Sequence, residues 1–376
     1  MRPATILAPA VLLCFCLSAF RCASPLSSPS NCEVSIVAYN VKSLFDAVDD
    51  GTEFREFSVA KGKWDDARYK IRLQRVAEAI FAALPDGTRS RAGAPGPDLL
   101  CLEEIENASV LEALRTGPLA KARYSYAAVA SAEGGPFSVC ALSRLPILAV
   151  ACHAARSNVE RPGRDILELK LDAFGRPLFV FACHWKSKSE GGDVTEGARR
   201  LAAALLRDLV SERLAKDPAA EVVVCGDFNE SPDEYLRVKK RYATAFMPVS
   251  EAAASPTVAS PGASPDRILV ASSASEVKPF GSSGELVLYS PWAESGGYSY
   301  SFSGSRERLD GFLLSPGLLD EVGLRFKRFS SVEAFFLVDE KGAPVAWPGT
   351  GTTGYSDHLP ILLILELEKG GAPTLP

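Results

Sequence analysis

Eight short apolar segments, rich in β-branched residues, each end at a small group of polar side chains. Runs of this length and composition are typical of strands that are buried on at least one face. The segments are residues 33–40, 97–107, 136–144, 164–171, 177–187, 221–231, 308–315 and 355–368. A chain with so many buried strands must build one or more large sheets, and its polar strand ends must lie at the rims of those sheets.

Two further segments have the periodicity of amphipathic helices. Acidic residues open the segment 65–84, and leucines recur every four residues in 195–216. The expected apolar stripes are Ile71, Val76, Ile80 and Leu84 in the first helix, and Leu201, Leu205 and Leu209 in the second. Helices that alternate with buried strands predict a layered α/β domain.

Composition agrees with a globular protein of one large core or two ordinary ones. Of 376 residues, 47% are hydrophobic and 23% charged, which excludes a disordered tail, a collagen-like fibre and a disulfide-dense miniprotein. The net charge of −5 excludes a globally basic nucleic-acid binder but permits a local basic groove. The Ser/Ala/Pro/Gly-rich stretch 249–284 is interpreted as a surface excursion because strands resume after it. We therefore expect one domain over residues 33–369.

The N-terminus has the pattern of an export signal. Residues 6–20 form an apolar run that is too short to span a bilayer comfortably, and a Ser/Pro-rich spacer follows. We expect residues 1–24 to hold a signal peptide and the start of the spacer, with 25–32 as its remainder. Cys22 is a candidate for lipid attachment, although Arg21 before it departs from the usual small residue. The protein is thus expected to be exported, either secreted or periplasmic, or anchored to the cell envelope by a lipid.

The cysteines do not form a metal-binding pattern. Cys101, Cys140, Cys183 and Cys225 all lie inside apolar segments, without CxxC pairs or clustered histidines. They are expected to be small buried hydrophobes, and a structural zinc site is not predicted.

The polar strand ends together form a candidate reactive site. Alone, each motif has a plain interpretation: GDFN is a common Asp/Asn turn and SDH a common cap. Together, the strand ends bring oxygen donors and two of the three histidines to one rim, and these suit Mg²⁺, with Mn²⁺ or Ca²⁺ as alternatives. Such an ion promotes phosphodiester cleavage by neutralising charge and orienting the phosphate. The residues are Asn40, Glu104, His184, Asp227, Asn229, Asp310, Asp357 and His358.

In this order, the segments resemble the endonuclease/exonuclease/phosphatase superfamily, which has the deoxyribonuclease I-like fold. The matching pieces are VAYNVKSLFD (37–46), LLCLEEIEN (99–107), VCALSRLPI (139–147), CHWKSK (183–188), VVVCGDFNESP (222–232), RLDGFLLS (308–315) and YSDHLPI (355–361). Residues 63–80 further resemble its bacterial, often exported, nuclease-like branch. The resemblance implies an α/β four-layer sandwich, with two mixed sheets face to face and helices outside.

The resemblance also implies roles for individual residues. Asn40 and Glu104 match the metal-binding pair, with Glu104 as the direct ligand, and Asp357 assists at the metal or the water. Asp227 and Asn229 would lie beside the attacking water and the scissile phosphate, and His184 would donate to a phosphate oxygen or the leaving group. His358 would be a general base oriented by Asp310, although either Asp227 or His358 has the chemistry to take the water proton.

Two positions depart from the family pattern. Members commonly have Gln where this chain has Glu103, and nuclease-like relatives often have Asn where it has Cys183.

The superfamily includes nucleases, sphingomyelinases and inositol-phosphate phosphatases, so the substrate depends on residues around the site. Basic residues favour nucleic acid, although they also fit a solvated face with ion pairs. Lys186, Lys188, Arg144 and Arg164 are the candidate substrate-binding residues, and Arg199 and Arg200 would extend the track. The aromatic segment 289–302 either packs on the core, stacks on bases or enters a lipid interface.

These observations predict an exported, Mg²⁺-dependent phosphodiesterase, an endonuclease of low sequence specificity acting on DNA or RNA. The alternatives are a sphingomyelinase-like lipid phosphodiesterase and an inactive surface protein that kept the fold for binding. No protein partner is implied, and a monomer is expected.

Overall fold

The structure is a computed structural model that describes residues 32–84, 93–131, 135–154, 164–252, 266–281, 285–349 and 351–367. The predicted signal peptide, most of the spacer, Cys22 and the end of the predicted domain lie outside these residues, so export and lipid attachment stay predictions. Among the described helices, none combines the length and the apolar character that a bilayer crossing requires.

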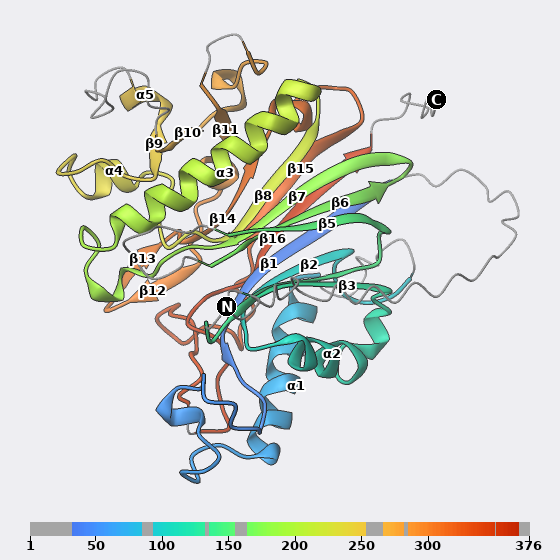
Figure 1. Ribbon diagram of the computed structural model, residues 1–376, viewed down its shortest axis with the longest axis vertical. Helices are drawn as coiled ribbons and strands as arrows, with labels where there is room; N and C mark the ends of the chain where they lie inside the picture. The colour runs from blue at the N-terminus through green and yellow to red at the C-terminus, as the bar shows by residue number, and fades with distance from the viewer. Residues whose placement is uncertain are drawn as a thin grey trace, which may run out of the picture. The chain divides into compact units, whose positions relative to one another are not determined.

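Two mixed sheets form the body of the domain (Figure 1). The smaller sheet has six strands, in the order β15 (Leu324–Ser331), β16 (Ile361–Leu367), β1 (Glu33–Leu44), β2 (Leu99–Ile105), β4 (Ser138–Ser143) and β3 (Tyr126–Ser131). The larger sheet has eight, in the order β5 (Ile147–His153), β6 (Ile166–Ala173), β7 (Arg176–His184), β8 (Glu221–Asp227), β14 (Asp310–Leu314), β11 (Val287–Tyr289), β10 (Ile268–Ala271) and β9 (Phe246–Pro248). A separate hairpin pairs β12 (Tyr300–Phe302) with β13 (Ser305–Glu307).

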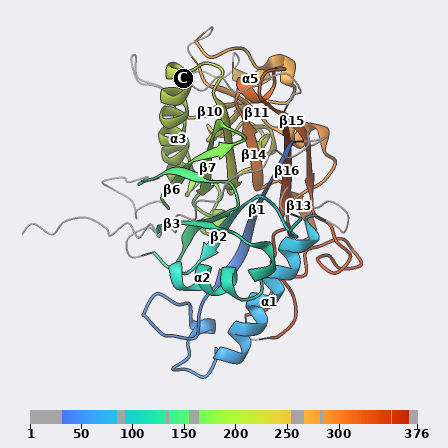
Figure 2. The same ribbon diagram turned by 90° about the vertical axis from the view of Figure 1, so that its right-hand side faces the viewer.

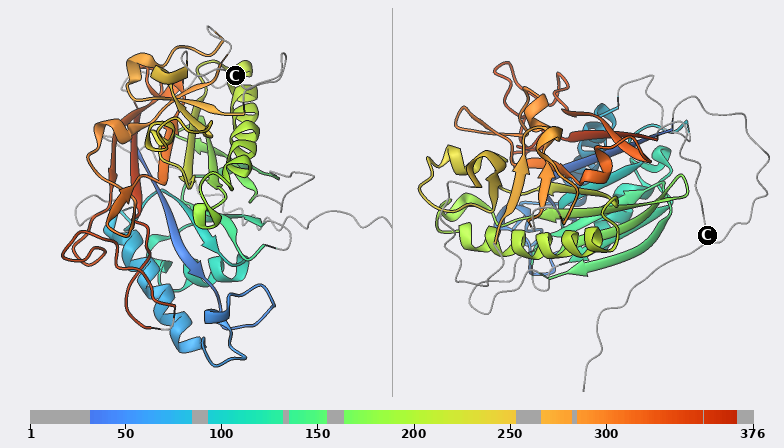
Figure 3. Two further views of the ribbon diagram at one scale, coloured as in Figure 1. Left: turned by 90° about the vertical axis from the view of Figure 1, so that its left-hand side faces the viewer. Right: turned by 90° about the horizontal axis from the view of Figure 1, so that it is seen from above.

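Helices cover the outer face of each sheet (Figures 2 and 3). Helices α1 (Asp66–Ala82) and α2 (Ala108–Thr116) pack on the six-stranded sheet, and α3 (Glu196–Lys216) packs on the eight-stranded sheet. The short helices α4 (Glu234–Arg237) and α5 (Val249–Ala252) flank β9 and β10. The result is the predicted four-layer sandwich of helix, sheet, sheet and helix.

Alternation along single strands divides the core into layers. In β1, Ile36 and Ala38 join the cluster between the two sheets, whereas Val37 and Tyr39 join the cluster under α1 and α2. Strand β8 alternates in the same way between the inter-sheet core and α3. A residue's parity therefore decides whether its side chain points between the sheets or toward a helix.

The helix predictions are confirmed in extent. For the first helix most of the predicted face is also confirmed, since Val76, Ile80 and Leu84 lie in the core together with Leu73, whereas Ile71 is only partly buried. In α3 the fully buried stripe runs through Leu206 and Val210, one position after the predicted leucines, because Ala202 and Ala203 let the helix approach the sheet along that line.

The interpretation of residues 249–284 as a surface excursion is wrong in part. Within the described part of this stretch, Ile268–Ala271 form β10, which is buried and pairs with both β9 and β11. Four buried residues among many small ones carry too short an apolar run to be separated from a loop in the sequence.

Gly226, directly before Asp227, provides a test of this architecture. Its φ is +124°, and a Cβ atom there would lie 2.0 Å from the backbone oxygen of Cys183 and 2.9 Å from Glu103 Oε1. We expect Gly226→Ala to lower the free energy of unfolding by about 3 kcal/mol, because backbone strain and a buried clash coincide. Urea denaturation checks this, with Gly296→Ala as control, since a Cβ at Gly296 meets nothing within 4 Å. Equal stability of the two variants would contradict the packing described.

Candidate active site at the sheet rim

Strand pairing places three predicted site residues in a row across the eight-stranded sheet. His184 at the end of β7 pairs in register with Asp227 at the end of β8, and Asp227 pairs with Asp310 at the start of β14. All three have the parity that points between the sheets, and all three are buried. Neighbouring strands lie about 5 Å apart, so the three side chains must share one small region.

Asn40 reaches this region from the opposite sheet. Its Nδ2 donates to Asp227 Oδ2 at 2.9 Å and to Glu104 Oε1 at 3.2 Å, so one amide joins carboxylates from both sheets. Its Oδ1 accepts the backbone N–H of Lys42 at 2.9 Å. In this arrangement Asn40 orients Glu104 and Asp227 through its N–H groups.

A turn at the end of β1 holds Glu104. Lys42 and Ser43 both have left-handed backbone conformations, as does Glu104 itself. The Ser43 backbone N–H and hydroxyl donate to Glu104 Oε2 at 2.9 and 3.2 Å. The buried guanidinium of Arg72 on α1 donates to the backbone oxygens of Val41 and Lys42. The turn thus fixes one carboxylate oxygen and leaves Oε1 to face Asn40.

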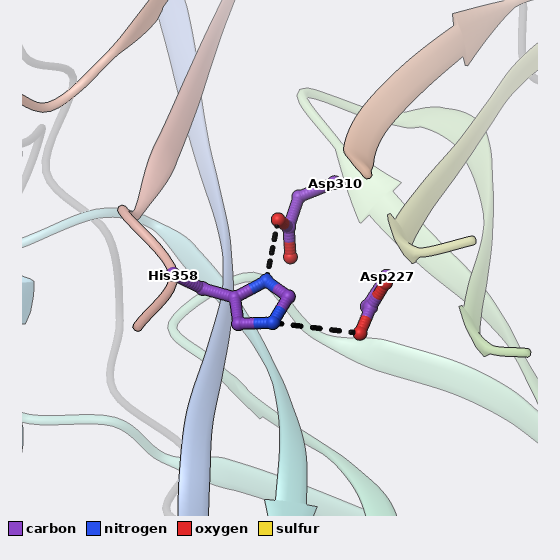
Figure 4. A group of neighbouring side chains, drawn as sticks. All are labelled: Asp227, Asp310 and His358. Carbon is purple, nitrogen blue, oxygen red and sulfur yellow. Dashed lines mark hydrogen bonds and ion pairs between the residues drawn. The ribbon is translucent and has the colours of Figure 1, made fainter. Parts of the chain in front are cut away.

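Asp310 and His358 form the hydrogen-bonded pair that the sequence predicts (Figure 4). The distance from His358 Nδ1 to Asp310 Oδ2 is 2.7 Å, and His358 Nε2 points toward Asp227 Oδ2 at 4.0 Å. The Ser356 hydroxyl donates to the backbone oxygen of Asn40 and accepts the His358 backbone N–H, which ties the SDH segment to β1. The Tyr300 ring lies 4.7 Å from the His358 ring, centroid to centroid.

Burial and neighbouring charges shift the pKa values of Asp227, His358 and His184 in different directions. Burial, with Asp310 adding to it, raises the pKa of Asp227 to about 7. Burial opposes a charged His358, but the Asp310 and Asp227 carboxylates outweigh it and raise the pKa of His358 well above its usual value. Burial and the nearby Arg164 lower the pKa of His184, so this imidazole is neutral near pH 7. Its Nε2 atom, 3.6 Å from Asp227 Oδ2, therefore makes no ion pair.

Asp357 and Asn229 make contacts that sequence reasoning missed. Asp357 Oδ2 pairs with Lys42 Nζ at 2.7 Å, and His358 and Lys42 hold the pKa of Asp357 below its usual value despite burial. The Asn229 backbone N–H donates to Asp227 Oδ1 at 2.8 Å, and its Nδ2 donates to Asp227 Oδ2 and to the Trp185 backbone oxygen. Asp227 thereby receives hydrogen bonds from two amide side chains.

The predicted basic track is only partly present. Arg164 lies at the site, where its guanidinium donates to the Trp185 backbone oxygen at 2.9 Å. Lys188 lies shortly after the end of β7, where its Nζ donates to both Glu234 and Glu307, and Lys186 pairs with Glu190. These lysines are already neutralised by neighbouring carboxylates, which the sequence did not indicate.

Arg144 and two other arginines lie elsewhere, so the prediction that Arg144 binds substrate is not supported. Arg144 donates to the backbone oxygens of Pro95, Gly96 and Ala122, near the start of β2 and thus at the opposite end of that strand from Glu104. Arg199 is buried and pairs with Glu196, and Arg200 pairs with Asp266. Sequence cannot separate structural arginines from substrate-binding ones, because their partners are distant in the chain.

The aromatic segment divides between the core and the site. Tyr289, Trp292 and Tyr298 are buried, as the core interpretation expects. Tyr300 stacks near His358, and Phe302 at the end of β12 is 66% exposed. Among the aromatic residues of this segment, Phe302 alone is strongly exposed, so most of the segment follows the core interpretation.

The site has the donor chemistry of a hard divalent cation. Four carboxylates gather here, and Asp310 Oδ1 is buried without a hydrogen-bond partner among the described residues. Ligand atoms of Asp227, Asp310 and His358 lie within 4.8 Å of one another. Oxygen-rich sites of this kind fit Mg²⁺, Mn²⁺ or Ca²⁺.

Comparison with known proteins agrees with the fold. The model of the Endonuclease/Exonuclease/phosphatase family matches residues 35–245, more than half of the chain. A family protein from Bacteroides thetaiotaomicron superposes with a TM-score of 0.50 at 13% identity, covering 90% of this chain and 99% of that one. Caenorhabditis elegans TDP2 gives 0.49 at 15% identity (89% and 97% covered), and D. rerio TDP2 complexed with single strand DNA product gives 0.46 at 15% (89% and 98% covered). No curated protein matches the sequence.

The hydrogen bond between Asp310 and His358 leads to a first testable prediction, on the protonation of His358. In metal-free protein, His358 should remain protonated above pH 6.5, whereas in Asp310→Asn the loss of the carboxylate should let burial lower its pKa. NMR titration of the imidazole resonances measures this, since the chain has only three histidines. An unchanged titration of His358 in the variant would contradict the pairing.

The burial of Glu103 leads to a second testable prediction, on the pH dependence of stability. It is fully buried, neither carboxyl oxygen has a hydrogen-bond partner among the described residues, and burial with nearby Asp310 raises its pKa well above the usual value. A carboxyl group whose pKa is higher in the folded than in the unfolded chain lowers the free energy of unfolding as pH rises above its unfolded pKa. The free energy of unfolding of Glu103→Gln should therefore increase relative to that of wild type, by up to about 3 kcal/mol between pH 4.5 and 7. Urea denaturation with EDTA across this range checks it, and a pH-independent difference would contradict it.

Proposed function

Because the chain belongs to the endonuclease/exonuclease/phosphatase family, we propose that it is a divalent-metal-dependent phosphodiesterase, and specifically an endonuclease of low sequence specificity. One observation carries the proposal: the Asn40 amide joins Glu104 and Asp227 from facing sheets, beside an imidazole held by Asp310. The arrangement provides cation ligands, a proton acceptor and a phosphate-facing cation within one buried rim.

Glu104 and Asp227 are the proposed cation ligands. Their oxygens converge on one amide nitrogen, and Glu104 retains partial solvent access, with 18% of its side chain exposed. Asp310 and His358 hold each other at 2.7 Å, which leaves them less free to ligate. Bound there, Mg²⁺ would polarise the phosphate and stabilise the departing oxygen. Asp357 would contribute only when released from Lys42.

Asp227 is also the proposed general base, through a carboxylate oxygen that the cation would leave free. Without a cation its pKa is about 7, and a bound cation would keep it ionised, whereas His358 already carries a proton. The proposal thus prefers Asp227, where the sequence leaves both residues as candidates. The His358 imidazolium, fixed by Asp310, would instead face the phosphate and stabilise negative charge as it develops.

His184 and Asn229 complete the proposed constellation. Neutral His184 has an N–H to donate to a phosphate oxygen, and Asn229 keeps Asp227 oriented through both of its carboxylate oxygens. In-line attack by water then displaces the leaving alcohol with inversion at phosphorus.

The substrate proposal relies on the surroundings of the site. Arg164 lies beside the reactive carboxylates, and the burial of Tyr289, Trp292 and Tyr298 does not provide the exposed aromatic surface that a lipid phosphodiesterase requires. A nucleic-acid strand offers the repeated phosphates that a basic residue at such a rim binds. We also propose that the enzyme is exported by its N-terminal apolar run, with or without a lipid on Cys22.

Nicking of supercoiled plasmid by the purified protein tests this function. With Mg²⁺ we expect open-circular product that EDTA abolishes, and we expect His358→Ala and Asp227→Asn each to lower the rate at least about 100-fold. His153→Ala is the matched control, because His153 lies on the edge strand β5 and its side chain is hydrogen-bonded to Glu168, which also pairs with Arg213 of α3, on the sheet face opposite the site. It should nick as fast as wild type.

Two results would contradict the proposal. An intact plasmid with both Mg²⁺ and Mn²⁺ would exclude the DNA endonuclease. Nicking that survives Asp227→Asn would show that another site, or a contaminant, carries the activity.

A further inference from the structure

A second group of carboxylates lies where the loop after β1 meets the end of β2. One carboxylate oxygen from each of Asp50, Glu53 and Glu106 lies within 4.8 Å of the others. Asp50 and Glu53 come from the loop, and Glu106 directly follows β2. This group is separate from the rim, although Glu106 is only two residues beyond Glu104.

Glu106 distinguishes this group from an ordinary exposed acidic loop. Glu106 is only 7% exposed, and its Oε2 accepts the backbone N–H of Asp46 at 2.7 Å. Its Oε1 is buried and has no hydrogen-bond partner among the described residues. A buried carboxylate oxygen without a partner is unfavourable, because it loses hydration and gains nothing in return.

No positive charge compensates the group within the described residues. Asp46, Asp50, Glu53 and Glu106 take part in none of the ion pairs found there. Like charges at this separation repel, and the repulsion is strongest for the buried member. A cation that reached Glu106 from the loop side would supply this missing counter-charge.

We propose that Asp50, Glu53 and Glu106 bind a divalent cation of the calcium class. Ca²⁺ accepts six to eight oxygens in flexible geometry, and three carboxylates on a loop and a strand end, completed by water, match this requirement. Mg²⁺ in proteins usually takes only one or two carboxylates and keeps most of its water. The ion would fasten the loop after β1 to β2, next to the turn at Ser43 that holds Glu104. The inference does not depend on the proposed function.

Calorimetric titration of the purified protein with Ca²⁺, together with thermal unfolding, tests the proposal. Wild type should bind one more Ca²⁺ than Glu106→Gln, and Ca²⁺ should raise its melting temperature by about 5 °C. Asp50→Asn changes an exposed loop position, so it should keep the fold even if Glu106→Gln does not. It should weaken Ca²⁺ binding at this site at least about tenfold. Glu56→Gln, an exposed residue of the same loop region outside the group, is the matched control and should bind as wild type.

The rim site is distinguished by Asp227→Asn, which should retain the loop site. Equal Ca²⁺ stoichiometry and affinity in wild type and Asp50→Asn would overturn the proposal. Stabilisation by Mg²⁺ with none by Ca²⁺ would overturn the assignment of the ion.

Discussion

The register between β7, β8 and β14 determines where the side chains of the candidate site meet. Pairing of His184 with Asp227, and of Asp227 with Asp310, places three polar side chains side by side on the face between the sheets. A slip of one residue would turn all three toward α3 and replace them with apolar neighbours. The buried alternation of β8, with Val223 and Cys225 on the inner face, therefore fixes the direction of Asp227 as firmly as it fixes the core.

Facing sheets turn this row into a reactive site. The inter-sheet space shields Asp227 and His358 from water, so neighbouring charges decide their protonation more strongly than they would at a surface. Burial makes Asp227 a weaker acid, whereas His358 keeps its proton because Asp310 lies against His358 Nδ1. The same burial that stabilises the sandwich thus gives adjacent groups opposite roles.

The polar residues at the strand ends were predictable because each directly adjoins a strongly apolar segment in the sequence. Asp227 ends β8 and Asp310 begins β14, whereas Asn40 lies inside β1, which continues to Leu44 beyond the predicted end. Strands β5 and β15 have no comparable apolar pattern, because their exposed and half-buried residues resemble those of loops. These two strands lie at sheet edges, where only one neighbour constrains the pattern.

Ion pairs account for most of the remaining errors. Lys42 finds Asp357 across 315 positions, and Lys188 finds Glu307 across 119, so no local pattern reveals that either charge is neutralised. Arg144 illustrates the converse, since backbone oxygens brought together by the fold occupy its guanidinium. Side chains that depend on distant partners require the structure before they can be assigned to a substrate.

In the proposed function, facing strands position Glu104 and Asp227 to hold the cation. Anomalous diffraction from crystals soaked in Mn²⁺ would locate that ion without relying on activity. We expect a peak at the rim within coordinating distance of Glu104 and Asp227, with the Asp310–His358 hydrogen bond intact. A rim peak on the His358 imidazole, with Glu104 unligated, would contradict it.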